Sequence, residues 1–139
     1  MRRFLIVMIC CIILIAFGCG AFGGVHEQRL VGNLGLFASK NREAMAIVVF
    51  NEDGNYIQLV SPTVFGVGWD QSHIVVKSHP WNLFDGDLML DRSQIEYYIV
   101  VVSGCRVFGP FGEQDFVLHC DILGVGKDLG FTQVFRDLE

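Results

Sequence analysis

The chain has 139 residues, the length of one domain, and a formal net charge of −5. Arg2 and Arg3 lie in the N-terminal segment, so residues 25–139 hold eight basic and 15 acidic residues, a net charge of −7. This balance argues against nucleic-acid binding, which depends on Lys and Arg contacts with phosphate, and against a polybasic membrane patch. The many Val, Ile, Leu and Phe residues can form a core, which excludes a disordered chain.

The N-terminal segment has the pattern of an export signal. A short basic stretch, Met1-Arg2-Arg3, precedes an unbroken apolar run over residues 4–17, which is short for a membrane span. Gly18-Cys19 then resembles the lipobox of bacterial lipoproteins, with Cys19 as the lipid attachment site. We therefore expect residues 1–24 to be a lipoprotein signal peptide and tether. A retained anchor and ordinary cleavage are the alternatives, and all three place residues 25–139 outside the cytoplasm.

Most of residues 25–139 has the pattern of β-strands. We expect strands over residues 30–39, 44–50, 56–68 and 73–78, of which the last three form a meander. The segment 51–55, Asn-Glu-Asp-Gly-Asn, has turn chemistry because Asp-Gly and Asn tolerate positive φ. Pro62 interrupts the third strand and indicates an edge or a bulge, because proline has no N–H to donate.

The C-terminal half combines a strong strand with a helix. Residues 79–93 are predicted to be a polar loop, and residues 94–102 a strand whose apolar residues face both ways, so both faces should be covered. Ser103-Gly104 predicts a turn into a partner strand over residues 105–108. A helix is expected from Gly112 to Gly124, with one apolar face. That face contains Phe116, Cys120 and Leu123. The tail, residues 129–138, is assigned to a last strand, with a short helix as the alternative.

These elements predict an α+β fold. It is a single small domain over residues 25–139, with an antiparallel sheet of five or six strands and one C-terminal-half helix packed on it. Cys105 and Cys120 lie near the contact between hairpin and helix, so a disulfide is conceivable, but we expect two free thiols because strand side chains alternate between faces.

Several motifs in the second half resemble a known family. In chain order they are Val67-Gly68-Trp69-Asp70, Tyr97-Tyr98-Ile99-Val100, Val107-Phe108-Gly109-Pro110-Phe111 with Phe116 after it, and Leu123-Gly124-Val125. Together with the lipobox they resemble a family of small bacterial lipoproteins, the domain of unknown function 3997, over about residues 60–135. The resemblance implies a fold and a location but no activity. Tyr97-Tyr98, Gly109-Pro110 and Phe116 are also similar to the GYF type of module, which binds proline-rich peptides.

Catalytic and metal-binding patterns are weak. Asp70 and His73 could form an acid–base pair, but a turn aspartate capping its own backbone beside a surface histidine is the preferred interpretation. Asp85-Gly86-Asp87 lacks the rest of a calcium-binding loop. Cys105 could act as a nucleophile with His119, although a buried, unreactive thiol is favoured.

We therefore expect a non-enzymatic envelope lipoprotein without cofactor or metal, held by its lipid on the cell membrane or outer membrane. Its partners would be the membrane and a protein or peptide, or it would have a structural role. The alternative is an immunity or inhibitor lipoprotein against a secreted toxin, and a small hydrolase is less favoured. The proposed binding surface contains Trp69, Asp70, Tyr98 and Phe111. Trp69 is at the same time the residue of this set that we most expect to anchor the core.

Overall fold

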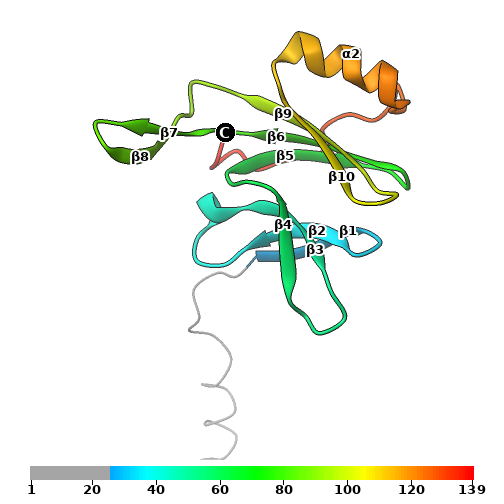
Figure 1. Ribbon diagram of the computed structural model, residues 1–139, viewed down its shortest axis with the longest axis horizontal. Coiled ribbons are helices and arrows are strands. Elements are labelled where there is room, and N and C mark those ends of the chain that lie inside the picture. The colour runs from blue at the N-terminus through cyan, green and yellow to red at the C-terminus, as the bar shows by residue number, and fades with distance from the viewer. Residues whose placement is uncertain (1–25) are drawn as a thin grey trace, which may run out of the picture.

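The computed structural model describes residues 26–139, and the predicted signal peptide, tether and Cys19 lie outside the described residues (Figure 1). In chain order, the elements are β1 (His26–Val31), β2 (Leu34–Ala38), η1 (Arg42–Ala44), β3 (Ala46–Phe50), β4 (Tyr56–Val60), β5 (Val64–Trp69), β6 (His73–Ser78), β7 (Trp81–Phe84), β8 (Asp87–Leu90), β9 (Glu96–Val101), β10 (Arg106–Phe111), α2 (Glu113–Leu123) and β11 (Gln133–Val134). Within the described residues, no helix is long and apolar enough to cross a bilayer.

The strands form two main antiparallel sheets. The first has the order β1-β2-β3-β4, and the second has the order β10-β9-β6-β5-β11. The pairing of β6 with β9 places Ser78 opposite Glu96 and His73 opposite Val101. The chain between these two strands leaves the sheet as a separate hairpin, β7-β8, which projects to the side in Figure 1.

The hydrophobic core lies between the two sheets, which are stacked in Figure 1. Leu34, Leu36, Ile47 and Val60 of the first sheet share one buried cluster with Val67, Ile74, Val76 and Val100 of the second. In most strands these residues alternate along the chain, because successive side chains point to opposite faces of a sheet. Two sheets joined through such a cluster bury the apolar face of each.

Helix α2 packs on the outer face of the second sheet, as Figure 1 shows. Phe116 stacks on Tyr97 of β9, with the ring centroids 4.9 Å apart. Tyr97 and Ile99 are therefore buried under this layer, whereas Val100 points into the core between the sheets. The prediction that both faces of the residue 94–102 strand are covered is confirmed.

The ends of α2 also agree with the sequence. Gly112 is the N-cap, and Gly124 ends the helix in the left-handed conformation at φ 70°. The amide of Val125 donates to the carbonyl of Cys120 over 2.9 Å, and that of Gly124 donates to Asp121 over 3.3 Å. This is the Schellman arrangement, which glycine favours because it has no Cβ to clash.

The α+β fold with antiparallel strands and one helix in the C-terminal half is confirmed, but the strands divide between two main sheets. The predicted continuous strand over residues 56–68 is wrong at Pro62. There the chain leaves the first sheet after β4 and enters the second at β5, so β3-β4 and β5-β6 are hairpins of different sheets. Proline cannot donate to a sheet ladder, which suits it to this crossing point.

Three further boundaries differ from the prediction. The expected strand over residues 30–39 is the hairpin β1-β2, which turns at Gly32 with φ 57°. The expected polar loop over residues 79–93 contains the hairpin β7-β8. The tail forms only the two-residue strand β11, paired with β5.

The turn of the β7-β8 hairpin explains how the sequence encodes it. Asp85 and Gly86 both have positive φ, at 50° and 89°. A two-residue turn with two positive φ angles is the type I′ turn, for which Asp-Gly is a preferred pair. The Asp85-Gly86-Asp87 stretch is thus a hairpin turn, and the apolar residues on both sides of it are its strands.

Candidate functional site

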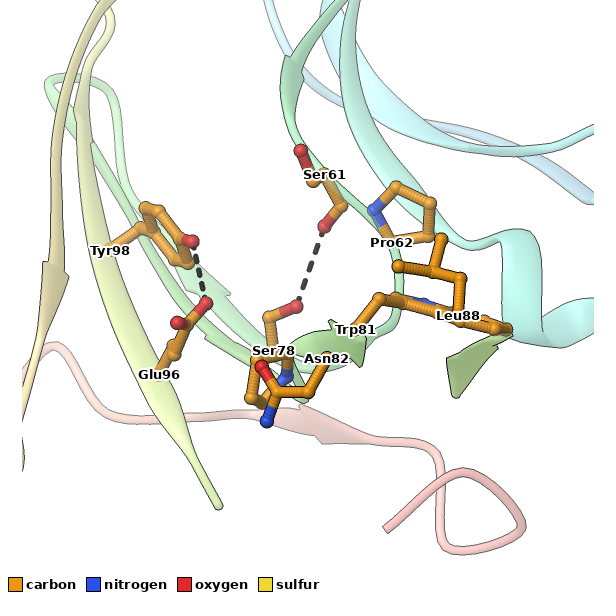
Figure 2. A pocket seen from close by; sticks show the side chains of 9 residues that line it. Ser61, Pro62, Ser78, Trp81, Asn82, Leu88, Glu96 and Tyr98 are labelled. Carbon is orange, nitrogen blue, oxygen red and sulfur yellow. Dashed lines mark hydrogen bonds between the residues drawn. The ribbon is translucent and has the colours of Figure 1, made fainter. Parts of the chain in front are cut away.

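A cleft lies at one end of the core, between the second sheet and the base of the β7-β8 hairpin (Figure 2). Its volume is about 590 Å³. The residues that line it come from the β4-β5 crossing, from the end of β6, from the hairpin and from the start of β9. They are Ser61, Pro62, Ser78, Pro80, Trp81, Asn82, Leu88, Glu96 and Tyr98. Four parts of the fold therefore build one concave, mostly apolar surface, the usual character of a binding site.

Glu96 and Tyr98 form the polar wall of the cleft. They are two residues apart on β9 and point to the same side, and the Tyr98 hydroxyl donates to Glu96 Oε2 over 2.8 Å (Figure 2). Burial raises the pKa of Tyr98 strongly, and the hydrogen bond and charge of Glu96 raise it further. Tyr98 thus remains a neutral donor at any physiological pH, and the pair presents one carboxylate to the cleft.

The position of Tyr98 depends on a glycine in the neighbouring strand. A Cβ at Gly109 would lie 2.6 Å from the Tyr97 carbonyl oxygen and 2.8 Å from Cδ1 of Tyr98, and φ at Gly109 is 128°. Only glycine adopts this conformation readily, and only without a side chain can the Tyr98 ring approach β10 so closely. Gly109 therefore allows Tyr98 to take its place beside the cleft.

The hairpin supplies the opposite wall, and it exposes an unusual amount of apolar surface. Leu83, Phe84, Leu88 and Met89 have exposed fractions of 74%, 67%, 61% and 55%, and Trp81 is 37% exposed. We call these five residues the hairpin patch. The strand pairing puts Trp81, Leu83 and Leu88 on one face of the hairpin and Phe84 and Met89 on the other. Scattered apolar residues are normal on a protein surface, but so many on one short projecting element are typical of an interaction site.

The base of the hairpin is held by hydrogen bonds. The Asp91 amide donates to the Pro80 carbonyl over 2.9 Å, and Asn82 Nδ2 donates to Asp91 Oδ2 over 3.1 Å. Asp91 Oδ1 accepts from both the amide and the hydroxyl of Ser93, and these bonds lower the pKa of the Asp91 carboxyl. These bonds therefore close the base of the hairpin and hold its two strands together there.

Behind the cleft, His79 ties the hairpin to the core. It is 2% exposed and stacks on Phe65 with the ring centroids 4.2 Å apart. Its Nδ1 donates to the Gln94 carbonyl over 2.7 Å, while Nε2 is buried without a hydrogen-bond partner. The backbone of His79 also exchanges two hydrogen bonds with Thr63, at 2.9 and 3.3 Å. His79 thus bonds to the β4-β5 crossing through its backbone and to the other end of the residue 79–95 segment through its ring.

The four residues predicted to form a binding surface lie in three places. Tyr98 lines the cleft. Trp69 packs against the core as expected, but it lies at the end of β5 that is away from the cleft. Val64 begins β5 beside the cleft, and Trp69 is five residues, or about 16 Å, further along the strand. Phe111 lies under α2 and stacks on His119 with the centroids 4.2 Å apart. The structure therefore brings only Tyr98 to the cleft, and sequence reasoning missed Trp81, Pro62 and Glu96.

Asp70 and His73 hold a turn together. Asp70 Oδ1 accepts from the amides of Ser72 and His73, both over 2.8 Å, which confirms the capping role. These bonds, the Ser72 one first, lower the pKa of Asp70 against the opposing effect of burial. The expectation of a surface histidine is wrong: His73 is 8% exposed, and its Nε2 donates to the Leu123 carbonyl over 3.0 Å. Its ring thus fastens the end of α2 to the sheet.

The remaining chemical candidates stay apart. Cys105 packs against the core between the sheets, whereas Cys120 belongs to α2 on the opposite face, and both are free thiols. His119 Nδ1 donates within its own helix to the Asp115 carbonyl over 2.7 Å. No group of three potential metal-ligating side chains occurs within residues 26–139.

Comparison with known proteins gives one match. A model of a protein family described as "protein of unknown function (DUF3997)" matches residues 32–135, most of the chain. The matched range contains all cleft residues. Neither the curated proteins nor the solved structures contain a significant match.

Proposed function

The chain belongs to the DUF3997 family, whose function is unknown, and we propose that it is a lipid-anchored envelope protein that binds a segment of a protein or peptide partner. The cleft and the hairpin patch would together form the binding surface. The observation that carries the proposal is this adjacency: Trp81 and Leu88 belong both to the wall of the cleft and to the exposed patch.

The chemistry of the cleft suits binding better than catalysis. Its ionisable lining groups are Glu96 and Tyr98, which are hydrogen-bonded to each other. Nucleophilic or acid–base catalysis needs a group poised to attack or to exchange a proton near neutral pH. The raised pKa of Tyr98 keeps its hydroxyl neutral, so it is not poised to exchange a proton. A neutral tyrosine beside exposed apolar side chains is instead typical of protein interfaces.

The anchor in this proposal rests on the sequence pattern of residues 1–19. If Cys19 carries the lipid, six residues separate it from His26, where β1 begins, so the two Cα atoms are seven residue steps apart. A fully extended chain of that length reaches at most about 25 Å. The cleft would then lie within one domain diameter of the bilayer surface, so the partner would be another envelope component or a molecule that reaches the membrane.

The test is selection of random peptides on phage against the full-length protein in detergent micelles. Ser61 is exposed and lines the cleft, so Ser61→Trp should fill the cleft without disturbing the core. Selected peptides should bind the wild type and lose at least tenfold in affinity for Ser61→Trp. Ser103→Trp, in the exposed β9-β10 turn, is the matched control and should bind like the wild type.

Two results would refute the proposal. One is a failure to select any peptide against the wild type. The other is a set of peptides that bind Ser61→Trp and wild type equally, because such peptides would occupy another surface. An immunity protein would instead give selective binding to one secreted toxin through a surface that Ser61→Trp leaves intact.

A further inference from the structure

We propose that the partner segment presents a lysine or arginine side chain, whose cationic head binds Glu96 while its aliphatic stem lies along Trp81. The proposal rests on the proposed function, because it identifies the chemistry that the cleft would recognise. The observation that carries it is one carboxylate, without an ion pair among the described residues, in a mostly apolar cleft.

Glu96 has no basic partner among the described residues, unlike Glu43 and Asp137. Glu43 lies 3.1 Å from Arg92, and Asp137 lies 2.9 Å from Arg42, so both are already in ion pairs. Glu96 forms no ion pair with any side chain of residues 26–139, although it is half-buried. The Tyr98 hydroxyl satisfies one of its oxygens. A carboxylate accepts up to about four hydrogen bonds, so Glu96 can accept further hydrogen bonds from a ligand in the cleft.

The uncharged part of the cleft suits the stem of a long basic side chain. Trp81 and Leu88 form one side, and Pro62 and Pro80 add further apolar surface. Lysine and arginine bury their methylene groups along such surfaces while the charged end reaches a polar partner. A cation near the face of Trp81 or Tyr98 would gain a further cation–π attraction.

The charge of the rest of the molecule selects the same partner. Residues 25–139 carry a net charge of −7, and the tip of the hairpin holds Asp85 in the turn and Asp87 at the start of β8. These carboxylates at the tip oppose insertion of the hairpin into an anionic bilayer. A second copy of the chain would bring the same negative charge. A basic segment of another protein is complementary in both respects.

The experiment uses full-length protein in detergent micelles, labelled with 5-fluorotryptophan. The chain has two tryptophans, so the fluorine spectrum contains one signal from Trp81 in the cleft and one from Trp69 as an internal control. The probes are butylguanidinium and its uncharged analogue of equal shape, butylurea. Butylguanidinium should shift the Trp81 signal saturably and leave Trp69 unchanged, with an affinity at least tenfold higher than that of butylurea.

Glu96→Gln should reduce the affinity for butylguanidinium to that for butylurea. Glu113→Gln is the matched control, because Glu113 is an exposed carboxylate at the start of α2, away from the cleft. The preference should also weaken with added salt, because a partly exposed ion pair is screened. If phage selection yields peptides, replacing their lysine by norleucine or their arginine by citrulline should cost at least tenfold in affinity.

Equal binding of the two probes would overturn this inference and leave the proposed peptide cleft standing, because the cleft would then select shape alone. A Trp81 signal that neither probe moves would also overturn it. Failure of the proposed function has a different signature, which is the absence of peptides sensitive to Ser61→Trp.

Discussion

Replacing Gly68 by alanine should destabilise the fold strongly, because the chain after α2 crosses the sheet directly over this residue. A Cβ at Gly68 would lie 1.7 Å from the carbonyl oxygen of Gly130, and contacts below 3.0 Å are essentially never observed. The two backbones would have to separate by at least about 1.3 Å. Overpacking of a well-packed site costs about 1–3 kcal/mol, and the upper end applies because the obstacle is backbone.

Gly130→Ala is the matched control on the other side of the same contact. A Cβ there would meet nothing within 4 Å, so stability should stay within about 1 kcal/mol of the wild type. Urea unfolding followed by far-ultraviolet circular dichroism measures the free energy of unfolding of both variants. In a thermal scan, the melting temperature of Gly68→Ala should fall by about 10 °C. Gly68→Ala with wild-type stability would refute the placement of residues 126–132 across the sheet.

Three more predictions concern single groups. Metabolic labelling with palmitate should mark the wild type and not Cys19→Ala, and equal labelling of the two would contradict lipidation at Cys19. Residues 25–139, exported to a periplasm behind a cleavable signal peptide and then denatured without reduction, should show two reactive thiols, Cys105 and Cys120, because they lie on opposite faces of the second sheet. Fewer than two would indicate a disulfide. Asp70→Asn should lower the melting temperature at pH 7. Because the folded pKa of Asp70 lies below its usual value of 3.8, the carboxylate contributes stability above that pH and loses it as the pH falls through the folded pKa. The difference between the variant and the wild type should therefore shrink below pH 3.8, and a difference that is constant with pH would refute the role of the charge.

The cleft shows where sequence reasoning fails for a site. Of the predicted binding residues, Tyr98 lines the cleft; it points to the opposite face of its strand from the buried Tyr97. Trp81 was hidden in a segment interpreted as a polar loop, although Asp85-Gly86 between Leu83-Phe84 and Leu88-Met89 is a recognised hairpin signal. No local signal places Pro62 beside Glu96, because the two are 34 positions apart and meet only through the pairing of β5, β6 and β9.

The sequence by itself determined the elements that depend on neighbouring residues. The helix ends at Gly124 because only a residue without a Cβ adopts the left-handed conformation with little steric strain. The strand over residues 94–102 is recognisable because its apolar residues form one unbroken run. Only the tertiary structure decided that the strands divide at Pro62 into two sheets. It also decided which face of β9 the helix covers, and that the hairpin patch is left exposed. These outcomes depend on contacts between distant segments, whose free energy is a property of the assembled core.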